Sequence, residues 1–169
     1  SQAKKVAFAT IFLYNVQVSF NEGSLFMTNN SCQSVGKYIS IIHRTGSSFL
    51  SKEFSKFNIG SEQYMYLIHL YKNDGLSQEE LTEILNIDKG TTAKSIKKLE
   101  TEGFVMRVKD KNDKRINRVY LTPKALEIKD EFLSSINAWE NTLTLNLSYA
   151  EKEQALTLLK KITYNITHK

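Results

Sequence analysis

Apolar side chains recur at helical spacing through the first part of the chain and predict four successive helices. The first covers residues 31–57, and the second covers residues 61–72, with Ser61 as a favourable N-cap. Two shorter patterns follow at residues 77–85 and 89–102. The first opens with a Ser77–Glu80 capping box, and its expected buried stripe is Leu81, Ile84 and Leu85. The break between these two is short, so we expect the last two helices to form a helix-turn-helix.

The spacing changes to strand character at residues 104–108 and again at residues 117–121, with a highly charged segment between them. This alternation predicts a β-hairpin with a charged tip. Thr122-Pro123 then provides a cap followed by proline at the first helical position, and it opens a long helix. Ser148 caps a last helix. The order of elements predicts a mainly α fold with a small β-hairpin wing.

The two ends of this pattern differ in character from its centre. Residues 58–122 are expected to form a winged helix-turn-helix domain, and residues 31–57 and 123–169 a helical dimerisation region. The later helices carry more apolar residues than one thin arm can bury, which predicts a homodimer. These residues include Leu143, Leu145, Leu147, Leu158, Ile162 and Ile166.

Residues 1–30 form an N-terminal extension that the helical pattern does not explain. Its apolar run, residues 6–18, is too short and too polar to span a bilayer, so no membrane partner is expected. Met27 begins a polar stretch of the kind that opens many bacterial proteins. Two interpretations stay open. Either Met27 is the native start, or residues 1–26 are a real segment that packs on the dimer.

Charge and cysteine content narrow the function classes. The net charge is +5, and residues 89–118 contain ten Lys or Arg against four Asp or Glu, so the basic excess is concentrated there. Such a concentration favours a nucleic-acid partner. The single cysteine, Cys32, cannot form a disulfide within the chain, which predicts a reducing compartment, the cytoplasm.

The helix at residues 89–102 is the candidate for insertion into DNA. Ala93, Ile96 and Leu99 form an apolar face that can pack on the preceding helix. A major groove about 12 Å wide admits one helix, whose polar face then meets base edges and phosphates. We expect that face to carry Thr91, Thr92, Lys94, Ser95, Lys97 and Lys98. The alternative is a solvated helix whose lysines only aid solubility.

The charged hairpin tip is the second candidate DNA contact. Its predicted DNA-binding residues are Lys111, Asn112, Lys114 and Arg115. Arg115 is expected to enter a minor groove, since narrow A·T-rich minor grooves attract arginine. Asp113 stands two residues earlier and is expected to orient the Arg115 guanidinium through a bidentate pair. The alternative is an exposed salt bridge with no further role.

The central residues resemble a known family. Residues 87–100, Ile-Asp-Lys-Gly-Thr-Thr-Ala-Lys-Ser-Ile-Lys-Lys-Leu-Glu, are similar to the recognition-helix signature of MarR-type regulators. Asn112-Asp113-Lys114-Arg115 and the later Leu121-Thr122-Pro123 resemble that family's wing and the start of its next helix. Two positions depart from the pattern. Asn112 stands where many members have arginine, and Ala93 where serine or threonine is usual.

This resemblance implies a homodimer that binds a pseudo-palindromic double-stranded operator, most often as a repressor. It also implies a small-molecule effector that binds between the dimer base and the winged lobe, or else oxidation of a cysteine. Cys32 is the candidate redox sensor, near a helix start where the dipole lowers a thiol pKa. The candidate cleft-lining aromatics, for which a core role is the better interpretation, are Phe49, Phe54, Tyr64, Tyr66 and Trp139.

Other function classes leave no trace in the sequence. There is no phosphate-binding loop, no nucleophile motif and no metal-ligand spacing around His43, His69 or His168, so we expect no enzyme, no metal and no cofactor. A winged-helix module used only for protein contacts remains the alternative, although such a module would not need the basic segment.

Overall fold

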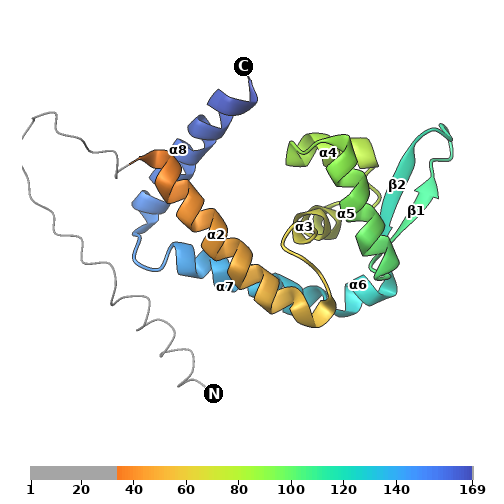
Figure 1. Cartoon of the computed structure of the whole chain (residues 1–169), viewed down its shortest axis with the longest axis horizontal. Coiled ribbons are helices and arrows are strands. Elements are labelled where there is room, and N and C mark those ends of the chain that lie inside the picture. The colour runs from red at the N-terminus through yellow and green to blue at the C-terminus, as the bar shows by residue number, and fades with distance from the viewer. Residues whose placement is uncertain (1–33, 169) are drawn as a thin grey trace, which may run out of the picture. The chain divides into compact units, whose positions relative to one another are not determined.

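The computed structural model describes residues 34–168, and these form helices and one hairpin in the predicted order (Figure 1). Residues 38–169 form a compact unit, which contains all the elements named below apart from the first residues of α2. The elements are α2 (Val35–Phe54), the short 3-10 helix η1 (Ser55–Phe57), α3 (Tyr64–Lys72), α4 (Gln78–Leu85), α5 (Lys89–Thr101), β1 (Val105–Lys109), β2 (Asn117–Leu121), α6 (Pro123–Glu127), α7 (Lys129–Leu143) and α8 (Tyr149–Thr167). This succession confirms the predicted fold class.

Aromatic rings join α2 to α7. Phe49 stacks on Trp139 with ring centroids 5.7 Å apart, and Phe54 stacks on Phe132 at 4.5 Å. A β-carbon on Gly46 would stand 2.8 Å from the Trp139 ring, so a glycine is required for this close approach of the two helices. The sequence pattern favoured a core role for these aromatics, and the packing agrees.

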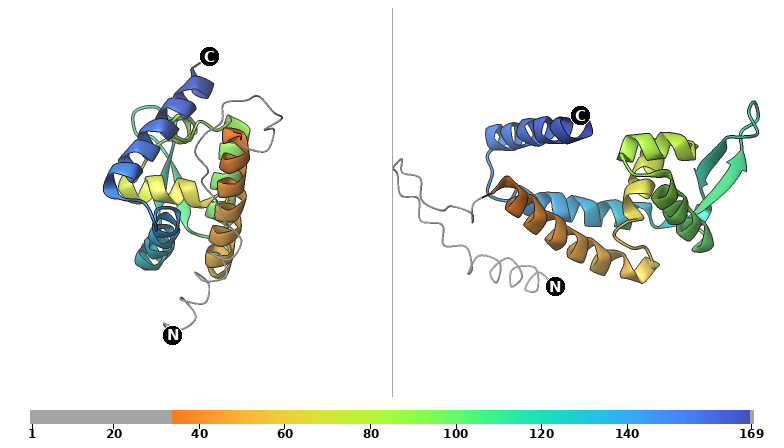
Figure 2. Two further views of the ribbon diagram at one scale, coloured as in Figure 1. Left: turned by 90° about the vertical axis from the view of Figure 1, so that its left-hand side faces the viewer. Right: turned by 45° about the horizontal axis from the view of Figure 1, so that its top comes forward.

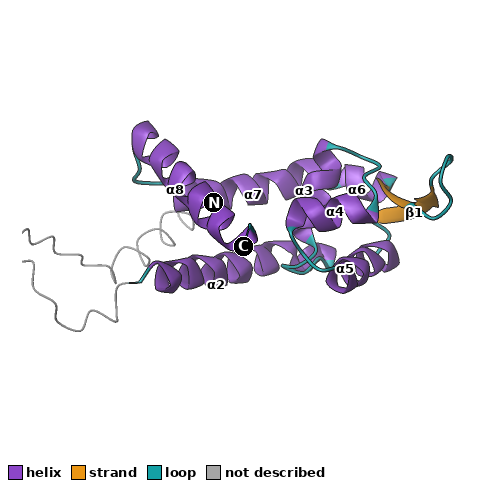
Figure 3. Ribbon diagram, turned by 90° about the horizontal axis from the view of Figure 1, so that it is seen from above, coloured by secondary structure: helices purple, strands orange, loops and turns teal. Residues whose placement is uncertain are grey.

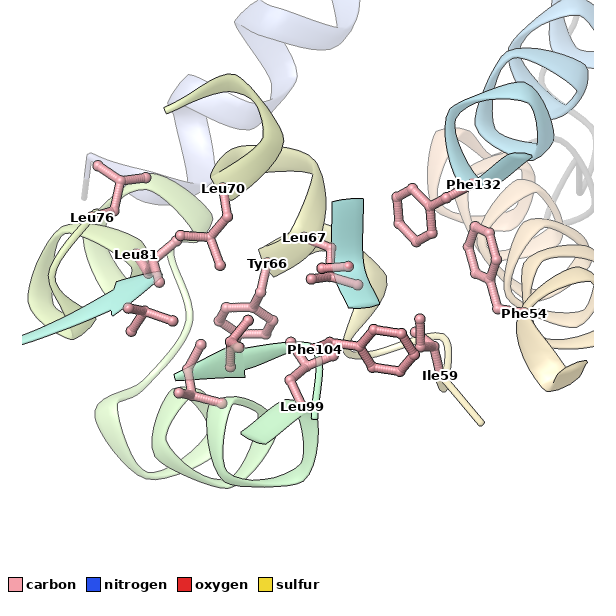
Figure 4. Close-up of a cluster of buried hydrophobic side chains, with 14 of the residues drawn as sticks. Phe54, Ile59, Tyr66, Leu67, Leu70, Leu76, Leu81, Leu99, Phe104 and Phe132 are labelled. Carbon is pink, nitrogen blue, oxygen red and sulfur yellow. The ribbon is translucent and has the colours of Figure 1, made fainter. Parts of the chain in front are cut away.

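The winged lobe has its own part of the core, which gathers side chains from α3, α4, α5 and the hairpin (Figure 4). Tyr66, Leu67 and Leu70 of α3 are fully buried, together with Leu81 of α4. The buried contributors from α5, from the residue before β1 and from the strands are Ile96, Leu99, Phe104, Val105 and Val119. These contacts fix the orientation of α5 about its own axis, and therefore decide which of its side chains face outward.

Three local expectations were wrong. Ser61 is not an N-cap, because α3 begins at Tyr64, and Gln63 turns back so that its Oε1 accepts from the Gly60 amide at 2.9 Å. Ile84, expected to be buried, is 49% exposed, and Leu81 is the residue of α4 that is fully buried. The long helix after Pro123 is divided into α6 and α7 at Ile128.

The hairpin is antiparallel, and Val105 pairs with Leu121 while Lys109 pairs with Asn117. The outer edge of β2 pairs with the turn between α3 and α4, since the Gly75 amide donates to the Val119 carbonyl at 3.1 Å. Gly75 has a left-handed φ of 82°, a conformation that glycine adopts without steric cost. The strands are therefore attached to the helical lobe, while the tip loop extends away from it (Figure 3).

Candidate nucleic-acid interface

Side-chain caps fix the helix-turn-helix at both of its helix starts. The capping box predicted for α4 is present, because Ser77 Oγ accepts from the Glu80 amide at 3.1 Å and Glu80 Oε2 accepts from the Ser77 amide at 2.6 Å. α5 is capped by Asp88, which accepts from the Thr91 amide at 2.9 Å. Sequence reasoning missed this second cap. An Asp before the first helical residue was the available signal.

The buried face of α5 is turned by about one residue from its predicted position. Thr92 is 0% exposed and Ser95 is 2% exposed, and together with Ile96 and Leu99 they form a stripe at i, i+3, i+4 and i+7. The Tyr66 hydroxyl donates to Thr92 Oγ1 at 3.3 Å, which satisfies both groups inside the core. The prediction that Thr92 and Ser95 face DNA was therefore wrong. Hydroxyl groups this small can be buried when a partner is available.

The outward face of α5 is cationic. Lys94, Lys97 and Lys98 are exposed, and Thr91 is half-buried near the N-terminus of the helix. Beside this face lies a shallow hollow lined by Glu62, Gln63, Thr91, Lys94, Ser95 and Lys98. Four of the six residues predicted on α5 are therefore available to a ligand outside the chain, and the lysines make that surface attractive to phosphate.

The hairpin tip carries the best-defined polar geometry in the wing. Arg115 donates from Nε to Asp113 Oδ1 at 3.0 Å and from Nη2 to Oδ2 at 2.7 Å, which is the bidentate pair expected from the sequence. The guanidinium holds the pKa of Asp113 below its usual value. The Arg115 side chain is nevertheless 90% exposed, so it is oriented without being covered. The neighbouring Lys111, Asn112 and Lys114 are exposed as well.

The structure adds a second carboxylate that sequence reasoning did not identify. Asp110 Oδ1 accepts from the backbone amides of Asn112 at 2.8 Å and Asp113 at 3.2 Å, while Oδ2 accepts from Arg118 Nε. The Arg118 hydrogen bond and the two amides hold the pKa of Asp110 down to about 2. In the sequence, Asp110 is one of several charged residues in a charged loop, and nothing there distinguishes it as the centre of a hydrogen-bond network. Its partner Arg118 becomes visible only once the strand register is known.

The remaining residues singled out from the sequence are buried or fall outside the described range. Phe54 and Tyr66 are fully buried, and Phe49, Tyr64 and Trp139 pack against the core. Cys32 lies outside residues 34–168. Within that range, no three His, Cys, Asp or Glu side chains are grouped so that they could hold a metal ion, and no helix has the length and apolar content needed to cross a membrane.

Comparisons with known proteins agree with this geometry. The MarR family model matches residues 59–116, which cover α3, α4, α5 and the hairpin up to the residue before β2. The uncharacterized HTH-type transcriptional regulator YybA of Bacillus subtilis is 30% identical over 128 residues, or 76% of this chain and 85% of YybA.

Solved structures extend the similarity to the fold. A MarR transcriptional regulator from Methanosarcina mazei has a TM-score of 0.71 and 35% identity, covering 78% of this chain and 94% of that one. The S. aureus MepR–DNA complex has a TM-score of 0.72 and 26% identity, covering 79% and 97%. The similarity thus includes the helices on both sides of the winged lobe. The chain belongs to the MarR family.

Proposed function

We propose that this protein is a sequence-specific, double-stranded DNA-binding transcriptional regulator that acts as a homodimer. One observation carries the proposal. A capped helix, α5, exposes three lysines, and the next element in the chain is a hairpin whose tip presents an oriented, almost fully exposed arginine. A helix for a major groove and a cationic wing for the flanking backbone are the two devices that a winged helix-turn-helix needs.

Within this proposal each exposed group has a distinct role. Thr91 and Lys94, in the first half of α5, are the candidates for base contacts, because residues near the start of a recognition helix reach furthest into the groove. Lys97 and Lys98 follow one turn later and are assigned to phosphates, as are Lys111 and Lys114 in the wing. Arg115 is assigned to the minor groove. The MepR–DNA complex is a similar structure that was solved with DNA, which supports this arrangement.

The homodimer is supported by apolar side chains that a single chain leaves exposed on α2, on α8 and on the loop between α7 and α8. They include Tyr38, Ile39, Ile41, Ile42, Leu145, Leu147, Leu156, Leu158, Leu159, Tyr164 and Ile166. Exposed apolar surface on this scale marks an interface in a folded protein. A two-fold dimer would place two copies of α5 on pseudo-palindromic half-sites about one helical turn apart. Repression relieved by a small molecule is the mode of regulation that we propose, on the basis of the family resemblance.

The test is selection of bound sequences from a random duplex pool, followed by a salt titration of the selected site. If several lysines and arginines neutralise phosphates, log K falls by about 0.9 per phosphate against log salt. Loss of binding in Arg115→Ala, with binding retained in Lys72→Ala as a charge-matched control at the exposed end of α3, would support the wing assignment. A flat salt response, or no enrichment of any sequence, would instead support a module for protein contacts.

A further inference from the structure

The hairpin is braced against the helical lobe from both of its faces. Arg107 pairs across the strands with Val119, and its neighbour Val108 pairs with Arg118. Successive residues of a strand point to opposite faces, so Arg107 and Arg118 lie on opposite faces of the hairpin. On the first face, Arg107 donates from Nη2 to Glu100 Oε2 of α5 at 2.5 Å and from Nε to Oε1 at 3.3 Å.

On the second face, Arg118 joins three segments of the lobe. Its Nε donates to the Asp110 carboxylate at the start of the wing loop, and its Nη1 donates to the Gly75 carbonyl at 3.0 Å. Glu80 Oε2, in the capping box of α4, lies 3.7 Å from the same nitrogen. One guanidinium therefore links the wing loop to the α3–α4 turn and to the first turn of α4.

Asp110 also shapes the wing loop itself. Its second oxygen accepts from the amides of Asn112 and Asp113, the residues that lead to Arg115. The Asp110 side chain is only 13% exposed, whereas that of Arg115 is 90% exposed. Figure 2 shows the loop that carries them at the end of the hairpin. The carboxylate of Asp110 is thus committed to the protein, and the Arg115 guanidinium is presented to the outside.

Charge alone predicts a different role for this carboxylate. A negative side chain in the wing repels the phosphates that the wing is proposed to approach, so its removal should strengthen binding to DNA. The network around Asp110 predicts the reverse. In Asp110→Asn an NH2 group replaces the oxygen that accepts from Arg118 Nε, and because this group cannot accept a hydrogen bond, the tip loses its attachment to Arg118. The two effects have opposite signs, which makes the role of Asp110 measurable.

We propose that Asp110 and Arg118 are positioning residues for DNA binding, which hold the wing tip, and with it Arg115, at a fixed place relative to α5. This inference rests on the proposed function. Neither residue is assigned a contact with DNA. Their effect on affinity passes through Arg115, and this distinguishes them from residues that merely stabilise the fold.

The experiment compares Asp110→Asn with Glu62→Gln by fluorescence anisotropy on the selected operator. Glu62 is exposed beside Lys94 and Lys98 and lies outside the wing, so its variant is a matched loss of one negative charge. We expect Asp110→Asn to bind about tenfold more weakly than the unmodified chain, which is the scale of one lost groove contact. Glu62→Gln should bind equally well or more tightly.

A double-mutant comparison provides the readout that a purely structural role would not change. Arg115→Ala alone should weaken binding about tenfold. Adding Asp110→Asn to that variant should weaken binding less than about twofold further, because the group that Asp110 positions is then already absent. Arg118→Lys, which keeps the charge and loses the planar fork, should reproduce the Asp110→Asn effect and serves as a second variant if Asp110→Asn folds poorly.

Three outcomes would overturn the inference. Asp110→Asn and Arg118→Lys could bind as well as the unmodified chain while Arg115→Ala binds weakly, which would leave the proposed function intact. The Asp110→Asn loss could be equally large in the Arg115→Ala background, which would show a general structural role. If the unmodified chain binds no duplex at all, the proposed function fails together with this inference.

Discussion

Replacing Thr92 with valine tests the orientation of α5, on which the assignment of its DNA-facing residues depends. Thr92 and Tyr66 are both fully buried, and the Tyr66 hydroxyl donates to Thr92 Oγ1. Valine keeps the shape of the side chain and has nearly the same helix propensity, so the substitution removes little besides the hydroxyl. The sequence-based interpretation predicts a change in base preference, whereas the structure predicts a change in stability.

The magnitude follows from the group that loses its partner. In Thr92→Val the Tyr66 hydroxyl stays buried without its acceptor, and a buried unsatisfied hydroxyl costs about 1–3 kcal/mol. The 3.3 Å separation indicates a weak bond, so we expect a free energy of unfolding lower by about 1 kcal/mol. For a chain of this length, that corresponds to a melting temperature lower by about 2–4 °C.

Tyr66→Phe should cost less, because the Thr92 hydroxyl can bond to a carbonyl one turn earlier in its own helix. Tyr66→Phe/Thr92→Val removes both partners, so the double variant should be more stable than Thr92→Val alone. Thermal unfolding of the four proteins at one fixed concentration gives the coupling energy and keeps any contribution from association constant. Selection from the random duplex pool with Thr92→Val gives its base preference.

The refuting result is specific. If Thr92→Val unfolds at the same temperature as the unmodified chain and prefers a different base at one operator position, α5 faces DNA with Thr92. The burial of Thr92 would then be wrong. If stability falls and the selected sequence is unchanged, the outward face is the one that carries Lys94 and Lys97.

Three further predictions concern other parts of the molecule. Arg115→Ala should weaken operator binding about tenfold and leave thermal unfolding unchanged, since it removes an exposed groove contact and no core; a fall in melting temperature comparable with that of Thr92→Val would contradict the wing assignment. Gly46→Ala should lower the free energy of unfolding by up to about 2 kcal/mol, because overpacking against Trp139 costs about 1–3 kcal/mol and the gain in helix propensity is about 1 kcal/mol. A more stable variant in a denaturant titration would show that α2 and α7 separate easily. The pKa of Asp110 is held down to about 2 against an ordinary 3.8, so its stabilising effect is fully present above pH 4 and is lost as the pH falls towards 2. In an acid titration followed by circular dichroism, Asp110→Asn should therefore lose stability less steeply over that range than the unmodified chain. Identical curves for the two proteins would argue against the network.

Local signals in the sequence located most elements correctly. The Ser77–Glu80 capping box, the charged hairpin and the Asp113–Arg115 pair join residues two or three positions apart, or follow from turn and strand patterns, and all three are present in the structure. Interactions between residues a few positions apart can be predicted from the sequence, because the local backbone fixes their geometry directly.

The features that sequence reasoning missed depend on tertiary contacts. Thr92, Ala93 and Ser95 are all small and uncharged, so their pattern does not determine which of them faces the core. Tyr66 on α3 decides it, because its hydroxyl donates to Thr92. The Arg118 network depends on strand register and on the α3–α4 turn, forty-three residues away from Arg118 at Gly75. The break between α6 and α7 at Ile128 was also missed, because no proline or glycine marks it in the sequence.

Footprinting of the purified chain on its selected operator shows whether α5 and the wing bind DNA together, as the proposed function requires. We expect two protected major-groove segments about one helical turn apart, with protection of the flanking minor grooves that is lost in Arg115→Ala. Absence of any protected segment at concentrations that saturate binding, or a pattern that Arg115→Ala leaves unchanged, would contradict this mode of binding.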